Sequence, residues 1–509
     1  MLTRTRSYTT LGLDALAIEV EVDAGRGLPT LTIVGLPDQA VKEARERLRG
    51  AILNSQFELP SMRFTVNLAP ADVKKEGGTF DLAMALGLLA ASGQLNPEPL
   101  ASVVALGELG LDGSVRPIRG MLPIALALRR RPQRLLIPMQ NAREATLAKG
   151  LEVTPVRSLR EAVDVLSGGC TTPAIRAPGP PHPKRSDCPD DLDFADVKGQ
   201  AHAKRALEVA VAGGHHVLLI GPPGSGKTML AQRIPTIQSD LSSEETLEVM
   251  TIQSVAGLLD GTPLISHRPF RSPHHTSSAV ALIGGGSVPK PGEVSLAHHG
   301  VLFLDELPEF HRDVLESLRQ PLEEGIVRIA RAKRSLSFPA RFLLVASMNP
   351  CPCGFLTDPR GRCRCPSTKV AAYLAKISGP LLDRIDLHID VPAVPLETLI
   401  HSGVVESSGT IRARIQRARR QQRRRLRSFG VPCNAHLRHR DLRASCFLTP
   451  ETLHLLKRAM QELYLSARSY DKILKISRTI SDLAGSDEIL PDHIAEAIQY
   501  RSLDRQLWV

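Results

Sequence analysis

Short apolar runs that end in glycine, acidic or amide residues recur in the middle of the chain. Val217–Ile220, Val301–Leu304 and Phe342–Ala346 are each long enough for a buried strand and too short for an ordinary helix. In open α/β sheets, ligands bind beyond the carboxyl ends of such strands. The pattern therefore predicts an α/β core with its functional residues directly after these runs.

The first 167 residues alternate between strand-like and helical patterns. Asp38 is a suitable N-cap for one helix, because its carboxylate can accept a hydrogen bond from the first turn. The pattern predicts an α+β domain over residues 1–167. Its expected strands are Ala17–Val22, Leu31–Val34, Phe64–Leu68 and Leu135–Pro138, and its expected helices are Asp38–Asn54 and Phe80–Ala91.

Three further segments follow this domain. Residues 168–190 are rich in proline and predict a semi-rigid linker. Residues 191–395 form the expected α/β core, which opens with a helix over Ala203–Ala212. Residues 396–509 are predicted to form a small helical domain. Its expected helices are Ile411–Arg427, Pro450–Leu465, Tyr470–Ala484 and Pro491–Tyr500.

Composition narrows the class of protein. No apolar run reaches the roughly 18 residues of a membrane span, and the N-terminus has no apolar leader segment, so we expect a soluble, cytoplasmic protein without membrane contact. The 8 cysteines suit a reducing compartment rather than a secreted disulfide framework. Residues 396–509 hold 20 Lys and Arg against 12 Asp and Glu, and this surplus indicates a polyanionic partner.

A phosphate-binding loop follows the first apolar run. Its pattern is Gly-x-x-x-x-Gly-Lys-Thr, and glycines allow successive main-chain N–H groups to point at a polyanion. Lys227 would reach the β- and γ-phosphates of ATP, and the Thr228 hydroxyl would bind Mg²⁺. The residues expected to bind nucleotide are Gly221, Pro222, Pro223, Gly224, Ser225, Gly226, Lys227 and Thr228.

Two carboxylates follow the second apolar run. Asp305 is expected to complete the Mg²⁺ shell, and Glu306 is expected to polarise the attacking water, which requires an acceptor within hydrogen-bond reach. Asn349 follows the third run and is expected beside them. The residues themselves therefore predict hydrolysis of a nucleoside triphosphate.

The N-terminal domain resembles the proteolytic domain of Lon proteases. The resemblance lies in residues 35–37, 75–81 and 106–109, with Asp112-Gly113 and Pro117-Ile118. That family uses a Ser–Lys dyad, whereas this chain has Thr79 at the serine position and no lysine in residues 119–124. We therefore expect a domain without peptidase activity that serves assembly or nucleic-acid contact.

The core is similar to AAA+ ATPases of the magnesium-chelatase-like branch. Residues 271–276 (Arg-Ser-Pro-His-His-Thr) and 284–286 (Gly-Gly-Gly) resemble the insert of that branch. Across nearly its whole length the chain is identified as a member of the ComM/YifB family. The fold class is then an α/β AAA+ P-loop core with a C-terminal helical lid domain and an N-terminal α+β Lon-protease-like domain.

The resemblance also implies roles for three residues and an assembly. Asn349 would be the sensor that holds the water or the γ-phosphate, Arg384 an arginine finger donated by a neighbouring subunit, and Arg468 a second sensor. It implies a homohexamer with ATP at the subunit interfaces. Its motor would be a helicase that promotes branch migration of DNA during natural transformation and homologous recombination.

Four cysteines cluster just after Asn349. Cys351, Cys353, Cys363 and Cys365 are expected to bind a structural Zn²⁺, with reduced unliganded thiols as the alternative, because the Cys-x-Cys spacing is shorter than the usual one. The pair His274–His275 lacks the cysteine or acidic complement of a metal site.

Nine arginines crowd residues 412–427, and their mutual repulsion would be relieved by an anion. Because aromatic residues make up only 4% of the chain, contact with the backbone of branched or single-stranded DNA is favoured over base stacking. The residues expected to contact DNA are Arg268, Arg271, Lys290, Arg420 and Arg424.

Other functions remain open from the sequence. A magnesium-chelatase-like motor for metal insertion into a porphyrin would need partner subunits, and a protein-remodelling AAA+ ATPase would not act on DNA. A Lon-type protease is disfavoured by the missing lysine, and a non-enzymatic scaffold by the intact catalytic set.

Overall fold

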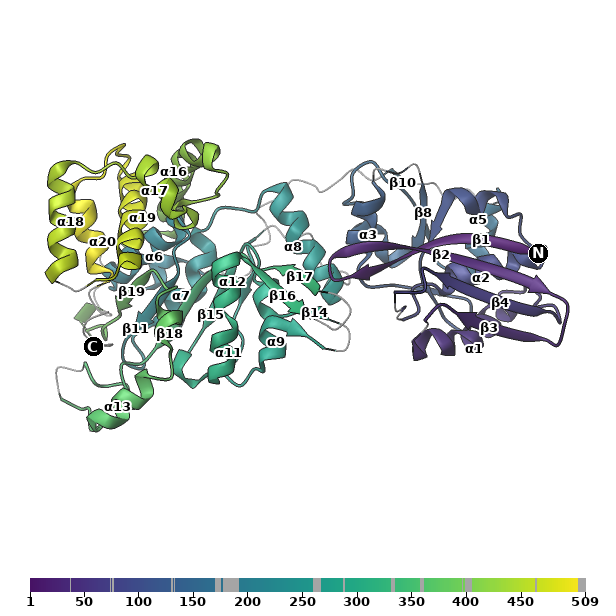
Figure 1. The fold of residues 1–509 in the computed structure, drawn as a ribbon, viewed down its shortest axis with the longest axis horizontal. Coiled ribbons are helices and arrows are strands. Elements are labelled where there is room, and N and C mark those ends of the chain that lie inside the picture. Colours follow the sequence, from purple (N-terminus) through teal and green to yellow (C-terminus); the bar gives the residue numbers. More distant parts are fainter. Residues whose placement is uncertain are drawn as a thin grey trace. The chain divides into compact units, whose positions relative to one another are not determined.

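The computed structural model divides the chain into two compact units (Figure 1). The first unit comprises Met1–Lys184 and Ser242–Ile265, and the second comprises Arg185–Leu241 and Ser266–Val509. Most of the predicted linker, 168–190, lies outside the described residues. The structure describes residues 1–36, 38–73, 75, 77–129, 131, 133–169, 175–176, 192–259, 267–286, 289–330, 335–357, 361–395, 397–398, 405–462 and 465–501.

An eight-stranded mixed sheet forms the centre of the first unit, in the order β10-β9-β8-β5-β1-β2-β4-β3. The four predicted strands lie within β2, β3, β4 and β8. The strands are β1 (Leu2–Leu11), β2 (Asp14–Gly25), β3 (Thr30–Val34), β4 (Arg63–Ala69), β5 (Val103–Ala105), β8 (Arg134–Pro138), β9 (Glu152–Val156) and β10 (Ile175–Arg176). A separate hairpin joins β6 (Glu108–Leu109) to β7 (Val115–Arg116).

The sequence pattern did not predict β1, which pairs antiparallel with β2 along its whole length. Its inward positions are polar: the hydroxyls of Thr3 and Thr5 are buried and donate to the carbonyls of Gly87 and Ala83, each at 3.0 Å. Polar side chains satisfied in this way can be buried without an apolar period. Hydrophobic alternation along the sequence therefore does not predict this strand.

Both helices predicted for the first unit are observed, and the other helices of this unit were not predicted. Asp38 caps α1 (Gln39–Asn54), since its carboxylate accepts from the Val41 N–H at 2.8 Å. The buried helix α2 (Asp81–Ala91) packs against β1 and β2. Three further helices complete this part: α3 (Met121–Leu128), α4 (Ala142–Ala145) and α5 (Leu159–Leu166).

A helix from the middle of the chain also belongs to the first unit. In α8 (Ser243–Ala256), the Ser254 carbonyl accepts from Gly120 N–H at 3.1 Å, and its hydroxyl accepts from Leu122 N–H at 3.3 Å. Met250 packs with Leu122 and Leu147 in a small apolar cluster. The predicted core, 191–395, is thus interrupted: its sequence leaves the second unit for this helix and returns.

A five-stranded parallel sheet forms the centre of the second unit, in the order β12-β15-β18-β11-β19. The three predicted core strands are confirmed and lie side by side in the order β15, β18, β11. The strands are β11 (Val217–Ile220), β12 (Phe270–Arg271), β15 (Val301–Leu304), β18 (Leu343–Met348) and β19 (Leu387–Asp390). Two small ribbons pair β13 (Gly284–Gly285) with β14 (Lys290–Pro291), and β16 (Ile326–Ala330) with β17 (Ser335–Pro339).

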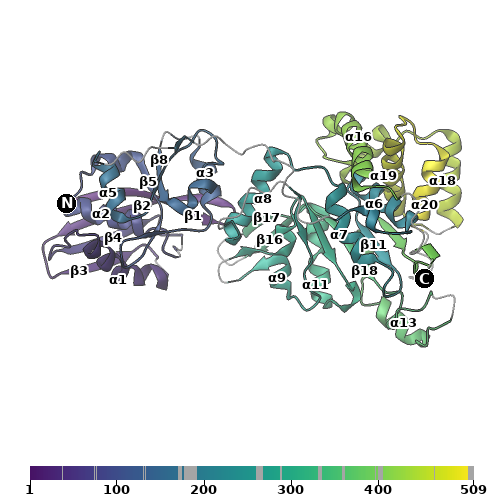
Figure 2. The same cartoon turned by 180° about the vertical axis from the view of Figure 1, so that it is seen from behind.

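Helices cover both faces of this sheet. Val217 and Leu219 of β11 join the apolar cluster of α6 (Ala201–Gly213) and α7 (Lys227–Ile237), which Figure 2 shows over the sheet. Leu218 and Ile220 join the cluster on the opposite face. That face is covered by α9 (Ala279–Ile283), α10 (Glu293–Leu296), α11 (Arg312–Ser317), α12 (Arg319–Glu324), α13 (Ser367–Leu374) and α14 (Gly379–Leu382).

The predicted helical region packs onto the core and shares its apolar cluster with α6 and α7. The four helices predicted here are observed with ends that agree to within three residues, and a fifth, over His439–Ser445, was not predicted. They are α16 (Ser408–Leu426), α17 (His439–Ser445), α18 (Pro450–Glu462), α19 (Ala467–Ala484) and α20 (Pro491–Gln499). Among the described residues, no helix combines the length and the apolar character needed to cross a membrane.

Candidate functional site

The phosphate loop lies between the end of β11 and the start of α7, as its sequence predicts. Gly224 and Gly226 have φ values of +75° and +91°, and a Cβ at either position would meet no atom within 4 Å. The buried Ser225 hydroxyl has no hydrogen-bond partner within the described chain. The loop thus offers open space and a free donor where a phosphate would sit.

Lys227 lies at the centre of this loop. Its ammonium donates to the carbonyls of Gly221 and Pro222 at 2.8 and 2.9 Å, and to the Asn349 side-chain oxygen at 3.2 Å. Burial lowers the pKa of Lys227, and the charges of Asp305 and Glu306 oppose this effect. The lysine and the asparagine are neighbours because β18 lies next to β11 in the sheet.

Asp305 connects two neighbouring elements at the end of β15. One carboxylate oxygen accepts from the Thr228 hydroxyl at 2.8 Å, and the other accepts from the Ser347 hydroxyl. A hydroxyl and a carboxylate this close are the oxygen ligands that Mg²⁺ takes in nucleotide sites. Ser347, which the sequence analysis did not single out, holds the orientation of the carboxylate.

Glu306 is paired with a residue that the sequence analysis considered only as a metal ligand. The His275 Nδ1 lies 3.7 Å from a Glu306 carboxylate oxygen. The Glu306 backbone has φ +52°, a left-handed conformation that costs a non-glycine residue about 1 kcal/mol or more. His275 is in the insert motif of residues 271–276, but only the folded chain places it beside the acid.

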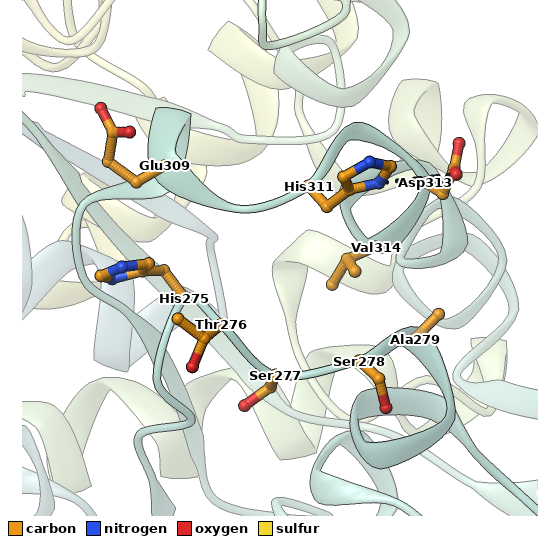
Figure 3. A pocket seen from close by; sticks show the side chains of 9 residues that line it. All are labelled: His275, Thr276, Ser277, Ser278, Ala279, Glu309, His311, Asp313 and Val314. Atoms are coloured by element: carbon orange, nitrogen blue, oxygen red, sulfur yellow. Dashed lines mark ion pairs between the residues drawn. The ribbon is translucent and has the colours of Figure 1, made fainter.

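An open hollow of about 470 Å³ lies on the other side of His275 (Figure 3). Figure 3 shows His275 and Glu309 at one side, and His311 with its ion-pair partner Asp313 at the other. No residue of the phosphate loop lines this hollow, so it is distinct from the phosphate site. Through His275 it is nevertheless adjacent to the residue expected to activate water.

Arg384 and Arg468, the expected finger and second sensor, lie close to each other. Arg384 pairs with Glu323 and donates to the Pro380 carbonyl, whereas Arg468 lies 3.3 Å from the carboxylate of Asp383. Neither guanidinium contacts the phosphate loop of its own chain within the described residues. Their roles toward ATP stay predictions, and that of Arg384 requires a second subunit.

The nine arginines of residues 412–427 divide into two sets. Four point inward and are paired: Arg412 with Asp240, Arg414 with Glu208 and Glu406, Arg419 with the Val211 carbonyl, and Arg425 with Asp482. The other five are exposed and make no ion pair or hydrogen bond with any part of the chain that the structure describes. We name them the arginine stripe: Arg417, Arg420, Arg423, Arg424 and Arg427.

The other residues expected to contact DNA have different surroundings. Arg268 donates to the carbonyls of Ser239 and His299, each at 2.7 Å, and Arg271 forms a two-pronged pair with Glu293 at 2.6 and 2.8 Å. Both guanidinium groups thus already have hydrogen-bond acceptors within the chain. Lys290, by contrast, is exposed on β14.

The four cysteines of residues 351–365 converge. The Sγ atom of Cys351 lies 3.4 Å from that of Cys353 and 3.7 Å from that of Cys363, and all four sulfurs lie within 4.8 Å of one another. Four thiolates bound to Zn²⁺ at 2.3 Å in a tetrahedron would be about 3.8 Å apart. This four-cysteine centre can therefore hold a metal ion with little rearrangement.

In the first unit, the position of the Lon serine lies in a turn. The main-chain carbonyl of Thr79 accepts from Gly107 N–H at 3.0 Å, and no basic side chain bonds its hydroxyl in the described chain. The buried Lys75 donates instead to the Pro70 carbonyl. That the unit has no peptidase activity stays a prediction.

Comparison with known proteins decides the family. A model described as magnesium chelatase, subunit ChlI, matches residues 193–399, and related ChlI models match residues 20–141 and 405–501. Competence protein ComM of Haemophilus influenzae is 42% identical over 98% of this chain and 97% of its own length. YifB of Escherichia coli is 43% identical over 98% and 96%, respectively. The chain belongs to the ComM/YifB family.

This membership confirms the expected fold class. The second unit contains the core of a magnesium-chelatase-like AAA+ ATPase, and the N-terminal region of this chain is related to Lon. Lon protease 2 of Bacillus subtilis is 31% identical over 144 residues, which cover 26% of this chain and 25% of that protein. The relationship to Lon is thus limited to a quarter of the chain.

Proposed function

We propose that the protein is a hexameric, ATP-driven motor that moves along DNA and promotes branch migration. The observation that carries the DNA part is the arginine stripe, a cationic helix face without partners among the described residues, on a unit that also carries the residues expected to bind ATP. Cations of this kind bind phosphates without reading the base sequence. The relation to a competence protein supports a role on incoming DNA.

The residues of the ATP site fit the chemistry of hydrolysis. Lys227 and the main chain of the phosphate loop would hold the phosphates, and Thr228 and Asp305 would hold Mg²⁺, which neutralises charge on the β- and γ-phosphates when bound. Glu306 would accept a proton from the attacking water, and Asn349 would orient that water. Arg384 of a neighbouring subunit would stabilise the developing charge.

The test is the dependence of ATP hydrolysis on branched DNA. ATPase activity would be measured with no DNA, with a forked duplex and with a Holliday junction, and strand displacement would be followed on the same substrates. We expect stimulation by both structures and displacement that requires ATP, with Lys227→Ala as the inactive control. Hydrolysis that is indifferent to DNA, without displacement, would favour a chelatase-like or protein-remodelling motor.

We also propose that the four-cysteine centre holds a structural Zn²⁺. The supporting observations are the convergence of four sulfurs and the exposure of most of the loop that carries them, which has little apolar packing of its own. Zinc quantification on the purified protein is expected to give one ion per chain. The variant with four serines should contain none, and wild-type protein without stoichiometric metal would refute the proposal.

A further inference from the structure

The loop that carries the four-cysteine centre begins at the ATP site. Cys351 is buried and follows Asn349 by two residues, so one metal-ligand candidate is covalently close to the residue that bonds Lys227. A main-chain turn follows at once, in which Gly354 N–H donates to the Cys351 carbonyl at 2.9 Å. The position of this turn is therefore tied to the first cysteine.

Gly354 brings the turn against the phosphate loop. It is buried with φ +82°, and a Cβ added there would collide with the Cδ of Pro223 and lie 3.7 Å from the Cγ of Asn349. The contact is so close that only a glycine fits. A single turn of the cysteine loop thus touches both Pro223 of the phosphate loop and the side chain of Asn349.

The other end of the cysteine loop returns to the same place. Helix α13 begins two residues after Cys365 and carries Tyr373, whose phenol lies beside the main chain of Asn349. Tyr373 is buried in the apolar cluster beneath the sheet. Both ends of the loop therefore contact Asn349, and the four-cysteine centre lies between them.

Few other contacts hold this loop in place. Among its described residues between 351 and 366, only Cys351 and Gly354 are buried. A metal ion that joins all four sulfurs would fix the turn at Gly354 relative to α13, because metal binding to such loops supplies the folding free energy that apolar packing does not. Without the ion, the contacts to Pro223 and Asn349 would lose their support.

We propose that metal in the four-cysteine centre positions the phosphate loop and Asn349, so that nucleotide binding and hydrolysis depend on metal loading. This inference rests on the ATPase and the Zn²⁺ site proposed above. Gly354 is a positioning residue that links the two sites, because its turn sets the positions of Pro223 and Asn349. The centre would then control the ATP site as well as the fold of its own loop.

The chain offers a matched pair of variants. Gly354→Ala places a methyl group against Pro223, whereas Gly361→Ala lies in the same loop, also at positive φ (+62°), with no atom within 4 Å of the added Cβ. Both variants incur a similar backbone cost, and both keep the four cysteines. Only Gly354→Ala disturbs the contact with the phosphate loop.

The experiment measures zinc content, affinity for a fluorescent ATP analogue without DNA, and kcat and KM for ATP. We expect Gly354→Ala to retain zinc and to lose about tenfold or more in ATP turnover, since small displacements of positioning groups have effects of this size. Gly361→Ala should retain wild-type affinity and turnover. Removal of zinc from the wild type by a strong chelator, followed by return to Mg²⁺ buffer, should reproduce the loss, and added Zn²⁺ should restore it.

Two results would overturn the inference: Gly354→Ala that behaves like Gly361→Ala, or zinc-free wild type with unaltered nucleotide affinity. Neither result bears on whether the protein is a DNA motor, which the dependence of hydrolysis on DNA decides. A wild-type protein that binds no nucleotide would refute the proposed ATPase itself.

Discussion

At the residue scale, the side chains of the proposed ATP site are held in place by hydrogen bonds to neighbouring elements. Asp305 accepts from Thr228 and Ser347 through different oxygens, and Lys227 donates to two loop carbonyls and to Asn349. Each side chain is therefore oriented by partners from the phosphate loop, from α7 or from a neighbouring strand. Preorganised groups of this kind need little rearrangement during reaction.

His275→Ala is expected to raise basal ATPase activity. Loss of the imidazole frees the Glu306 carboxylate to face the attacking water, and a partly exposed pair worth up to about 1 kcal/mol corresponds to at most about a fivefold rise in kcat. KM for ATP should not change. Steady-state kinetics without DNA would test this.

His274→Ala is the matched control for this variant. His274 stacks on His275 with ring centroids 4.1 Å apart and bonds Thr276, but it makes no contact with Glu306 in the described chain. It should leave kcat unchanged. A fall in kcat together with a rise in KM for His275→Ala would contradict the restraint of Glu306 by His275 and indicate a purely structural role.

His216 predicts acid sensitivity of the second unit. Burial lowers its pKa to about 4, and its Nδ1 accepts from Leu344 N–H at 3.0 Å, which requires a neutral ring. In the unfolded chain the pKa is about 6.5, so the unfolded state binds more protons between these values. The contribution of neutral His216 to the free energy of unfolding is therefore fully present above pH 6.5 and is lost as pH falls toward 4.

We expect this histidine to lower the free energy of unfolding by roughly 2 kcal/mol between pH 7 and pH 4.5. The protein would be unfolded in urea at each of the two pH values. The unfolded fraction would then be measured from hydrogen exchange in β18, with the labelling pulse always applied at the same pH. His216→Gln retains an acceptor for the Leu344 N–H without a titrating ring. An equally steep loss in that variant would show that another group is responsible.

At the element scale, local pattern predicted α1, α2, α6 and four helices of the C-terminal region, but it missed α3 to α5, α8 to α14 and strands such as β1 and β19. The strand β1 was missed because its buried positions include Thr3 and Thr5, whose hydroxyls donate to main-chain carbonyls of α2. The division of α16 into paired and exposed arginines was also beyond the sequence. It depends on acids brought from distant segments, such as Asp240 and Asp482.

The arginine stripe is expected to supply the salt-dependent part of DNA binding. Gln at Arg417, Arg420, Arg424 and Arg427 should weaken affinity for single-stranded and forked DNA about equally and make its salt dependence shallower. Each lost phosphate contact lowers the slope of log K against log salt by about 0.7–0.9. Fluorescence anisotropy over a series of salt concentrations would measure the slope.

Arg425→Gln is the control from the same helix. It removes an inward guanidinium that pairs with the fully buried Asp482, with both distances at 2.7 Å. We expect it to cost roughly 2 kcal/mol of stability, because the buried carboxylate loses its charged hydrogen bonds to Arg425 but keeps its ion pair with Arg478 at 3.0 Å. Its DNA salt slope should stay that of the wild type, whereas an unchanged slope in the stripe variant would locate the DNA contact elsewhere.

At the scale of the whole molecule, the expected arginine finger makes hydrolysis a property of the assembly. Arg384 does not contact the phosphate loop of its own chain in the described residues, which agrees with a role in a neighbouring subunit. Lys227→Ala and Arg384→Ala are each expected to be inactive. Mixed rings should regain part of the activity, because some interfaces then combine an intact loop with an intact arginine.

The measurement is ATPase activity across mixing ratios of the two variants, with the sum of the separate activities as the baseline. Sedimentation would establish that mixed rings have formed. Mixed rings without any gain above that baseline would contradict a finger donated between subunits. Activity retained by Arg384→Ala alone would contradict its catalytic role altogether.

The amino-acid sequence by itself determined the phosphate loop, the two acids after β15 and the asparagine after β18. Each of these features is a short local segment of the chain, and its chemistry follows from residue type and spacing. The pairing of His275 with Glu306, the exposure of only five of nine arginines and the contact of Gly354 with Pro223 were decided by the tertiary structure. Each depends on which distant segments of the chain pack against one another, and only the folded structure specifies that packing.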